Sequence, residues 1–213
     1  MRGSQKNKNY VIKWTSGFAY AIGLLTADGC LSSDGRHLEF CSKDKEQVEN
    51  FIQCLNLTNR IGRKSRSNEK VKKYYRVQFG NKKLYSFLYL IGLKSRKSLI
   101  LEKVDIPSKF FADFLRGLFD GDGCFKVFKH PESQHPQIRV KFTSASPKFI
   151  RWLYRKIGQK LSTCGFILKG TRAEDLEYAI EDSIKLLNYM YYSSDVICLS
   201  RKFQKARPYF MRT

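Results

Sequence analysis

The sequence predicts an α+β fold made of two similar halves, and three observations support this. A ten-residue segment recurs in the second half of the chain, and β-rich and helical segments follow each copy in the same order. Hydrophobic residues make up 42% of the 213 residues, which is enough apolar material to bury a core and excludes a disordered basic tail. This length allows one large domain or two small ones, and the repeat favours two halves.

The repeat aligns residues 21–30 with residues 115–124 without gaps. Unrelated segments of this length share about one identical residue, since each residue type occurs at roughly 5–9%. Here five positions are identical: Gly23 and Gly117, Leu24 and Leu118, Asp28 and Asp122, Gly29 and Gly123, and Cys30 and Cys124. The alternative to a functional repeat is a duplication that serves only folding. The repeated segment includes an aspartate at an expected helix end, which favours a functional role.

Hydrophobic periodicity places matching elements after each copy. In the first half we expect a strand at residues 37–42, a helix at 44–55 with Asp44 as N-cap, a strand at 74–79 and a helix at 82–91. In the second half we expect a strand at 137–143, a helix at 146–161 with Ser146 as N-cap and Pro147 at its first position, and a helix at 182–191. Each half then carries a basic dipeptide, Arg96-Lys97 or Arg201-Lys202.

These patterns set the halves at residues 10–103 and 110–213, with a linker at 104–109. Ile106 in this linker precedes a proline, which disfavours helix. The apolar run at 18–25 has the look of a secretion signal, but a similar run recurs deep in the chain and neither reaches the ~20 residues of a membrane span. We therefore predict neither a signal peptide nor a membrane partner.

The charge of the chain indicates a nucleic-acid partner. There are 40 Lys and Arg residues against 19 Asp and Glu, which gives a net charge of +21 that is spread along the sequence. The six cysteines form no C-x-x-C pair, so we expect reduced thiols in an intracellular compartment and no zinc ribbon. The histidines His37, His130 and His135 have no metal-site spacing, and no phosphate-binding loop motif is present.

Small residues recur on one face of each repeated helix. Ala19, Gly23 and Ala27 are four residues apart, as are Gly117 and Gly121 in the second copy. Packing along these faces would bring the two helices unusually close, since glycine has no side chain to separate them.

Each repeated helix ends on Asp-Gly, and we expect Gly29 and Gly123 to end it in the left-handed conformation. Asp28 and Asp122 would then meet at the negative ends of two helix dipoles, where they repel unless a cation is present. Their carboxylates, with the carbonyls of Ala27 and Gly121, suit Mg²⁺ or a similar cation such as Mn²⁺. With a basic surface around them, metal-assisted phosphodiester hydrolysis is the hypothesis that follows.

These paired segments resemble the two signature helices of a LAGLIDADG homing endonuclease in its single-chain form, over about residues 18–205. The resemblance implies two pseudo-symmetric αββαββα repeats, which form a saddle of antiparallel sheets on a central two-helix interface. It also implies a monomer that makes a Mg²⁺-dependent double-strand break with short 3′ overhangs at a long target site in double-stranded DNA. In the family, the last acidic residue of each motif binds the catalytic metal, which carries over to Asp28 and Asp122.

Further roles follow from the same resemblance. Lys97 and Lys202 resemble the active-site lysine of the family, which could stabilise charge at the phosphate, and Ser42 and Ser144 fall where the family often has a solvent-organising residue. The sixth motif position is Thr26 in one copy and Asp120 in the other, so we expect a packing or capping site there and not a metal ligand.

The strand at 137–143 alternates polar and apolar residues with period two, which predicts one core face and one polar, basic face. Arginine and lysine can read guanine and glutamine can read adenine in the major groove. An ordinary solvated sheet face is the alternative, but the net charge favours DNA contact. The DNA-binding residues predicted are Arg63, Lys64, Arg66, Arg76, Gln78, Gln137, Arg139, Lys141, Lys169 and Arg172.

The sequence thus predicts a site-specific DNA endonuclease of intron or intein origin. We expect it in a compartment that contains DNA: a bacterial or archaeal cytoplasm, or an organelle. An RNA maturase or DNA-binding regulator of the same fold is the alternative, although such relatives typically lose a motif carboxylate and both are present here. A general architectural DNA-binding protein would explain the charge but not the duplicated Asp-Gly helix ends.

Overall fold

The two halves of the chain contain helices and strands in the same order. The structure, a computed structural model, describes residues 11–65, 71–129 and 136–210. The N-terminal half consists of α1 (Ser16–Asp28), β1 (Gly29–Leu31), β2 (His37–Ser42), α2 (Lys45–Cys54), β3 (Gly62–Lys64), β4 (Tyr74–Gly80) and α3 (Lys82–Leu90). The C-terminal half consists of the short turn η1 (Ser108–Phe110), α4 (Phe111–Asp122), β5 (Gly123–Lys129), β6 (Pro136–Ser144), α5 (Pro147–Leu161), β7 (Phe166–Lys169), β8 (Glu174–Tyr178), α6 (Ile180–Met190) and the closing helix α7 (Ser200–Phe210).

Each half contains one four-stranded antiparallel sheet, and the two sheets have matching topology. The strand orders are β1-β2-β4-β3 and β5-β6-β8-β7. The registers also match, because Gly29 pairs with Phe40 and Gly123 pairs with Phe142 at the start of each sheet. The predicted α+β fold of two αββαββα repeats is confirmed.

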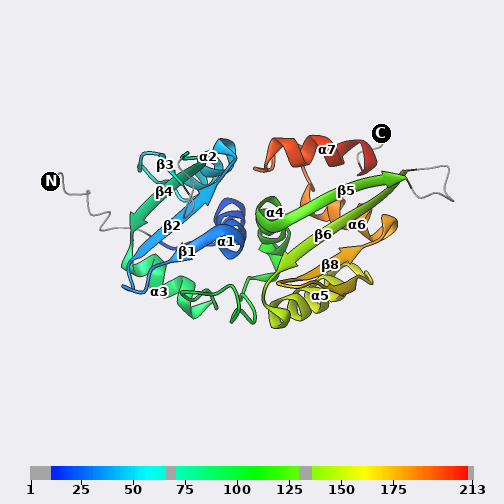
Figure 1. The fold of residues 1–213 in the computed structure, drawn as a ribbon, viewed down its shortest axis with the longest axis horizontal. Helices are drawn as coiled ribbons and strands as arrows, with labels where there is room; N and C mark the ends of the chain where they lie inside the picture. Colours follow the sequence, from blue (N-terminus) through cyan, green and yellow to red (C-terminus); the bar gives the residue numbers. More distant parts are fainter. Residues whose placement is uncertain (1–10, 66–70, 130–135, 211–213) are drawn as a thin grey trace.

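The helices α1 and α4 lie side by side in the centre of the molecule, with one sheet on each side (Figure 1). In each half, helices pack against one face of the sheet, and the strands alternate buried and exposed residues accordingly. In β6, for example, Ile138, Val140 and Phe142 are buried against the helices. Within the described part of the chain, the opposite face of each sheet has no helix packed against it, and we call these two surfaces the open sheet faces.

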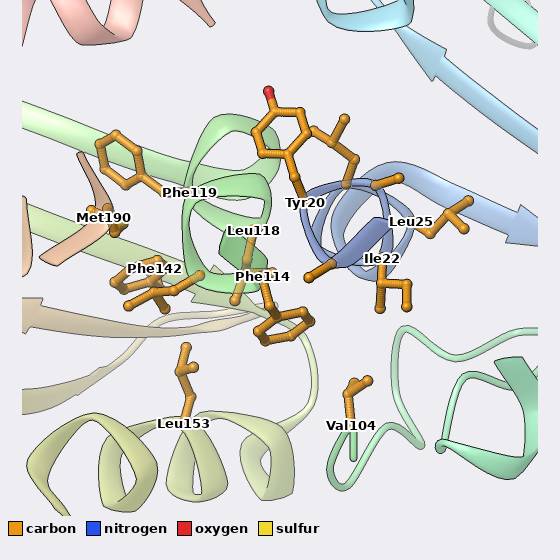
Figure 2. Packing of buried hydrophobic residues seen from close by; sticks show 14 of the residues in the cluster. Tyr20, Ile22, Leu25, Val104, Phe114, Leu118, Phe119, Phe142, Leu153 and Met190 are labelled. Atoms are coloured by element: carbon orange, nitrogen blue, oxygen red, sulfur yellow. The ribbon is translucent and has the colours of Figure 1, made fainter. Parts of the chain in front are cut away.

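The core of each half is filled by large side chains that point away from the contact between α1 and α4 (Figure 2). Ile22 and Leu25 of α1 point into the N-terminal half, whereas Phe119 of α4 points toward Phe142 and Met190. The rings of Phe119 and Phe142 lie 6.0 Å apart. The helix contact itself is therefore left to small residues.

Helix N-caps agree with the sequence in part. Ser146 caps α5 by accepting from the amide of Phe149, with Pro147 at the first helical position, as predicted. Asp44 occupies the N-cap of α2, but its side chain forms no capping bond there and instead accepts two hydrogen bonds from Arg201 at 3.0 and 2.8 Å. This pair joins the two halves. Within the described ranges, none of the helices has the length and apolar character needed to span a membrane.

Candidate active site

The contact between α1 and α4 is so close that side chains are excluded from its centre. A Cβ added to Gly23 would lie 2.2 Å from the carbonyl oxygen of Phe114, and one added to Gly117 would lie 2.1 Å from that of Tyr20. Both obstacles are backbone atoms, which cannot rotate away. The predicted packing along small-residue faces is confirmed.

Both helices end at the predicted aspartates, but the glycines after them are not left-handed. Gly29 has φ −80° and Gly123 has φ −79°, so both are extended, and the prediction of a left-handed helix end was wrong. The physical reason is that β1 and β5 begin directly at these glycines. Glycine is still required, because a Cβ would lie within 2.6 Å of the Leu25 carbonyl oxygen in one half and 2.5 Å of the Phe119 carbonyl oxygen in the other.

The last turns of α1 and α4 meet at the aspartates. A Cβ added to Gly121 would lie 2.3 Å from the Cβ of Ala27 and 3.8 Å from Oδ2 of Asp28, so the Asp28 carboxylate reaches the neighbouring helix. Burial at this junction and the charge of Asp28 raise the pKa of Asp122 to about 6. The two carboxylates therefore lie close enough to interact, at the negative ends of two helix dipoles.

Lys97 lies near this pair of carboxylates. Its side chain is 7% exposed, and Nζ donates a hydrogen bond to the carbonyl oxygen of Gly29 at 2.5 Å. Burial lowers the pKa of Lys97, while the charges of Asp122 and Asp28 oppose that shift. The lysine is thus close enough to act electrostatically on both aspartates.

Lys202 lies beneath the end of α4 and is bound more extensively. Its Nζ lies 2.6 Å from the carbonyl oxygens of Phe119 and Gly123, 2.9 Å from that of Asp120 and 3.3 Å from that of Gly121. Burial lowers its pKa, and the Asp120 carboxylate opposes that shift. An ammonium group here neutralises the negative end of the α4 dipole.

The two lysines occupy matching places, since each donates to the first strand residue after its helix, Gly29 or Gly123. This equivalence supports the alignment of the two basic dipeptides. The halves nevertheless differ. The four carbonyl groups around Lys202 use all the donors of its ammonium group, whereas among the described residues Lys97 donates to one carbonyl group.

The donors at the meeting point of the aspartates fit a hard divalent cation. Asp28, Asp122 and the carbonyls of Ala27 and Gly121 offer oxygen atoms only, and Mg²⁺ is usually held by one or two carboxylates together with water or phosphate. Among the residues described, no group of three or more His, Cys, Asp or Glu side chains could hold a metal by itself. A cation here would therefore depend on oxygens from solvent or substrate as well. His37 pairs with Asp34, while His130 and His135 lie outside the described residues.

The sixth motif position has the structural role that we expected. Asp120 is 1% exposed, and it accepts hydrogen bonds from the Tyr20 hydroxyl and the Leu199 amide, both at 2.7 Å. Thr26 donates to the carbonyl of Ile22 within its own helix. Neither residue lies among the oxygen donors described above.

Ser42 and Ser144 are used by the backbone. Each accepts a hydrogen bond from the amide two residues further on, Asp44 at 3.1 Å and Ser146 at 3.2 Å. Ser42 is also buried and donates to Gln47. Both serines therefore support the turn before α2 or α5, and this does not favour the expected solvent-organising role.

Six of the predicted DNA-binding residues lie on the open sheet faces. Strand pairing places Glu39 opposite Gln78, and Cys124 opposite Lys141, which fixes the open face of each sheet. The six residues on these faces are Lys64, Arg76, Gln78, Gln137, Arg139 and Lys141. Lys126 of β5 also lies there, opposite Arg139, and the alternation of Phe125, Lys126 and Val127 was a signal that could have identified it.

The other four residues do not share these faces. Arg63 pairs with Tyr75, and its guanidinium stacks on that ring at 4.1 Å on the helix-covered side of the sheet. Lys169 pairs with Glu174. Because Glu174 and Asp175 are adjacent in β8 and Asp175 lies on the open face, Glu174 and its partner Lys169 lie on the helix-covered side. Arg172 lies in the turn between β7 and β8, and Arg66 lies outside the described residues.

Carboxylates within the open faces pair with the basic residues there, and we did not predict them. Glu39 pairs with Lys64 and Arg76, Asp175 with Lys141 and Thr143, and Glu177 with Lys126 and Arg139. Burial alone would raise the pKa of Asp175, but the hydrogen bonds from Lys141 and Thr143 lower it overall. These pairs hold the basic side chains in defined positions.

Arg139 contacts two aromatic rings as well as a carboxylate. Its guanidinium lies between the rings of Phe128 and Phe166, at 5.4 and 5.0 Å, and 3.5 Å from the Glu177 carboxylate. Side chains held in this way lose little conformational entropy when they bind a base.

Comparison with known proteins identifies the fold. A family model for a LAGLIDADG-like domain matches residues 109–156, from η1 through most of α5. The homing endonuclease I-WcaI, solved with its DNA recognition sequence, is similar over 99% of this chain and 94% of its own, with a TM-score of 0.63 and 12% identity. The endonuclease I-SmaMI, solved with an uncleaved DNA target in the presence of calcium ions, is similar over 87% of this chain and 86% of its own, with a TM-score of 0.56 and 12% identity.

A second kind of protein shares the fold. Full-length DUF199/WhiA from Thermatoga maritima is similar over 92% of this chain, with a TM-score of 0.57 and 14% identity, and this chain spans 62% of its length. No curated protein sequence matches the chain.

Proposed function

We propose that this chain, whose residues 109–156 are a LAGLIDADG-like domain within a two-repeat LAGLIDADG fold, is a site-specific endonuclease that cuts both strands of DNA. The observation that carries the proposal is the convergence of Asp28 and Asp122 between two open sheet faces in a chain of net charge +21. Two carboxylates at the point where DNA approaches would repel phosphate. They are useful there only if cations bridge them to the backbone of the DNA.

In this proposal, the open sheet faces bind the duplex and set its position. Gln78 and Arg76 would read one half of the target, and Gln137, Arg139 and Lys141 would read the other, because such side chains can bond base edges in the major groove. Both motifs lie in one chain, so a monomer carries the complete pair of aspartates.

At the centre, Asp28 and Asp122 would hold Mg²⁺ or a similar divalent cation, with the Ala27 and Gly121 carbonyls beside them. Such a cation supplies Lewis-acid stabilisation of the reacting phosphate and lowers the pKa of bound water. Lys97 would place a positive charge close to the scissile phosphate, where it stabilises the negative charge that develops during cleavage. Two closely spaced cleavages across the minor groove would leave short 3′ overhangs.

Cleavage of DNA that spans the uninterrupted form of the host gene tests this function. The native chain should linearise such DNA with Mg²⁺ and not with a chelator, whereas Asp28→Asn and Asp122→Asn should bind it without cutting. Asp195→Asn is the matched control, because Asp195 is exposed and lines a pocket with Ser16 and Gly17 at the start of α1, whereas Asp28 lies at the other end of that helix. Undiminished cleavage by either motif variant, or by the native chain without metal, would refute the proposed site. Specific binding by the native chain with no nicking would instead favour the alternative, a maturase or regulator.

A further inference from the structure

A cavity of about 550 Å³ lies at the opposite end of the central helices from the aspartates. It is bounded by the linker before α4, by Trp14 ahead of α1 and by one side of α5. The helix α1 begins at Ser16 and ends at Asp28, so about 18 Å of helix separates the cavity from the candidate active site. Nothing in the proposed nuclease function uses this cavity.

Aromatic and basic side chains line the cavity. Trp14, Phe111 and Trp152 contribute aromatic walls, and Lys156, Gln159 and Lys160 from α5, which are exposed, form what we call its rim. Trp14 stacks on Phe110 with ring centroids 6.2 Å apart, which fixes the plane of that wall. Lys160 donates to Ser108 at 3.0 Å. Among the described residues that line the cavity, Asp105 is the one acidic residue. The volume is in the range of about 300–1,000 Å³ that is typical of sites for small organic molecules.

The helix beside the cavity is far more basic than its counterpart in the other half. The sequence of α5 contains five basic residues, Lys148, Arg151, Arg155, Lys156 and Lys160, and no acidic residue. The matching helix α2 contains one basic and two acidic residues. The fold therefore does not require this charge, since the equivalent helix packs on its sheet without it.

The basic residues of α5 point away from the open sheet face. The buried residues of α5, such as Phe149, Leu153 and Ile157, pack on the helix-covered side of β6 and β8. Among the described residues, none of Arg151, Arg155, Lys156 and Lys160 forms an ion pair, and Lys148 pairs with Glu102. A duplex on the open face could not reach these side chains, so they need a separate explanation.

We propose that the cavity and the outer face of α5 bind a single-stranded nucleic acid, with one unstacked base in the cavity and phosphates along α5. A polyanion is indicated by the charge of α5, and aromatic units are indicated by the walls of the cavity. Aromatic walls with a basic track are the combination that single-strand binding proteins use. A duplex does not fit, because its bases are stacked and cannot enter a cavity without being flipped out.

The two walls provide a direct readout, because Trp14 and Trp152 are the only tryptophans in the chain. A base that stacks in the cavity should quench the tryptophan fluorescence of the full chain. The probes are oligonucleotides of about 12 nucleotides, in separate RNA and DNA arms, with a duplex of the same sequence as the comparison. We expect saturable quenching by at least one of the two single strands and none by the duplex, and the arm that binds more tightly identifies the sugar.

Charge reversal at the rim gives the decisive comparison. The double variant K156E/K160E should weaken single-strand binding by about 10-fold or more, since stacking and phosphate contacts would both be disturbed. The matched double variant K82E/K83E, at the exposed start of α3, should change single-strand binding by less than that and serves as the control for total charge. Binding without quenching, equal quenching by the duplex, or equal losses in the two double variants would overturn the proposal. These outcomes do not depend on whether the chain cleaves DNA.

Discussion

Substitution of Gly117 by alanine tests whether backbone contact between α1 and α4 positions the two aspartates. In an isolated helix this change would stabilise the helix by about 1 kcal/mol, because alanine is the better helix former. In the folded chain the new Cβ would lie 2.1 Å from the carbonyl oxygen of Tyr20, whereas ordinary contacts begin at 3.4 Å. The helices would have to separate by about 1.3 Å, which is the difference between these two distances.

Overpacking of this kind costs about 1–3 kcal/mol, and the upper end applies because both sides of the contact are backbone. After subtraction of the helix gain, the free energy of unfolding should fall by about 2 kcal/mol, which corresponds to about 4–8 °C in melting temperature for a chain of this size. Cleavage should fall about 100-fold, since a displacement of about 1 Å at a catalytic group costs that much. Duplex binding should be nearly unchanged, because the sheets are not altered.

The measurements are thermal unfolding, duplex affinity and the single-turnover cleavage rate, with Gly62→Ala as control. A Cβ at Gly62 would have the Arg76 carbonyl oxygen at 3.8 Å as its nearest neighbour, which is an ordinary contact. If Gly117→Ala were as stable as the parent chain, the helices would not be in backbone contact and the argument for paired aspartates would fail.

Three further predictions concern charged groups. In urea titrations, Lys202→Met should lower the free energy of unfolding by about 3 kcal/mol, because four carbonyl groups lose their donor. Lys97→Met should lower it by about 1 kcal/mol, because one carbonyl group does. Equal losses would contradict the difference between the two lysines. Arg139→Ala should cost about 1–3 kcal/mol against targets with particular base pairs and less against others, and a uniform loss across single-substitution targets would remove it from base reading. The pKa of Asp122 is about 6 against an ordinary 3.8, so the folded metal-free chain binds this proton more tightly than the unfolded chain; the resulting stabilisation of the fold is present below about pH 4 and is lost as the pH rises through 6. Asp122→Asn removes this titration, so the melting temperatures of the variant at pH 5 and pH 7 should differ by less than those of the native chain. An unchanged difference would refute the assignment of the raised pKa to Asp122.

The central helices could be predicted from the sequence because their requirement is local. Backbone contact needs glycine at fixed helical spacing, so Gly23 and Gly117 stand out in the sequence as they do in the structure. The same reasoning failed for Gly29 and Gly123, because a helix that runs directly into a strand needs no left-handed residue.

The sheet face on which a side chain lies, and the residue that it pairs with, could be predicted less well from the sequence. Both depend on pairing between strands that are distant in the chain. The short edge strands β3 and β7 contain too few residues to show alternation, so Arg63 and Lys169 could not be assigned to a face. The acidic composition of β8 is untypical of a strand. For this reason neither the strand nor the position of its carboxylates on the open face was predicted. The four bonds of Lys202 likewise join segments about eighty residues apart and leave no trace in local sequence.

The carboxylates on the open faces change what a net charge of +21 does for this chain. An unpaired arginine on an open sheet would attract any phosphate, and binding would depend little on sequence. Arg139 and Lys141 are instead already paired, with Glu177 and Asp175. To contact DNA, Arg139 and Lys141 must give up these carboxylates for an acceptor on the DNA. That acceptor must have an equally good position. The carboxylates also repel the negative charge of phosphate, whereas a base edge is neutral, so we expect the paired carboxylates to reduce binding to unrelated sequences more than binding to the target.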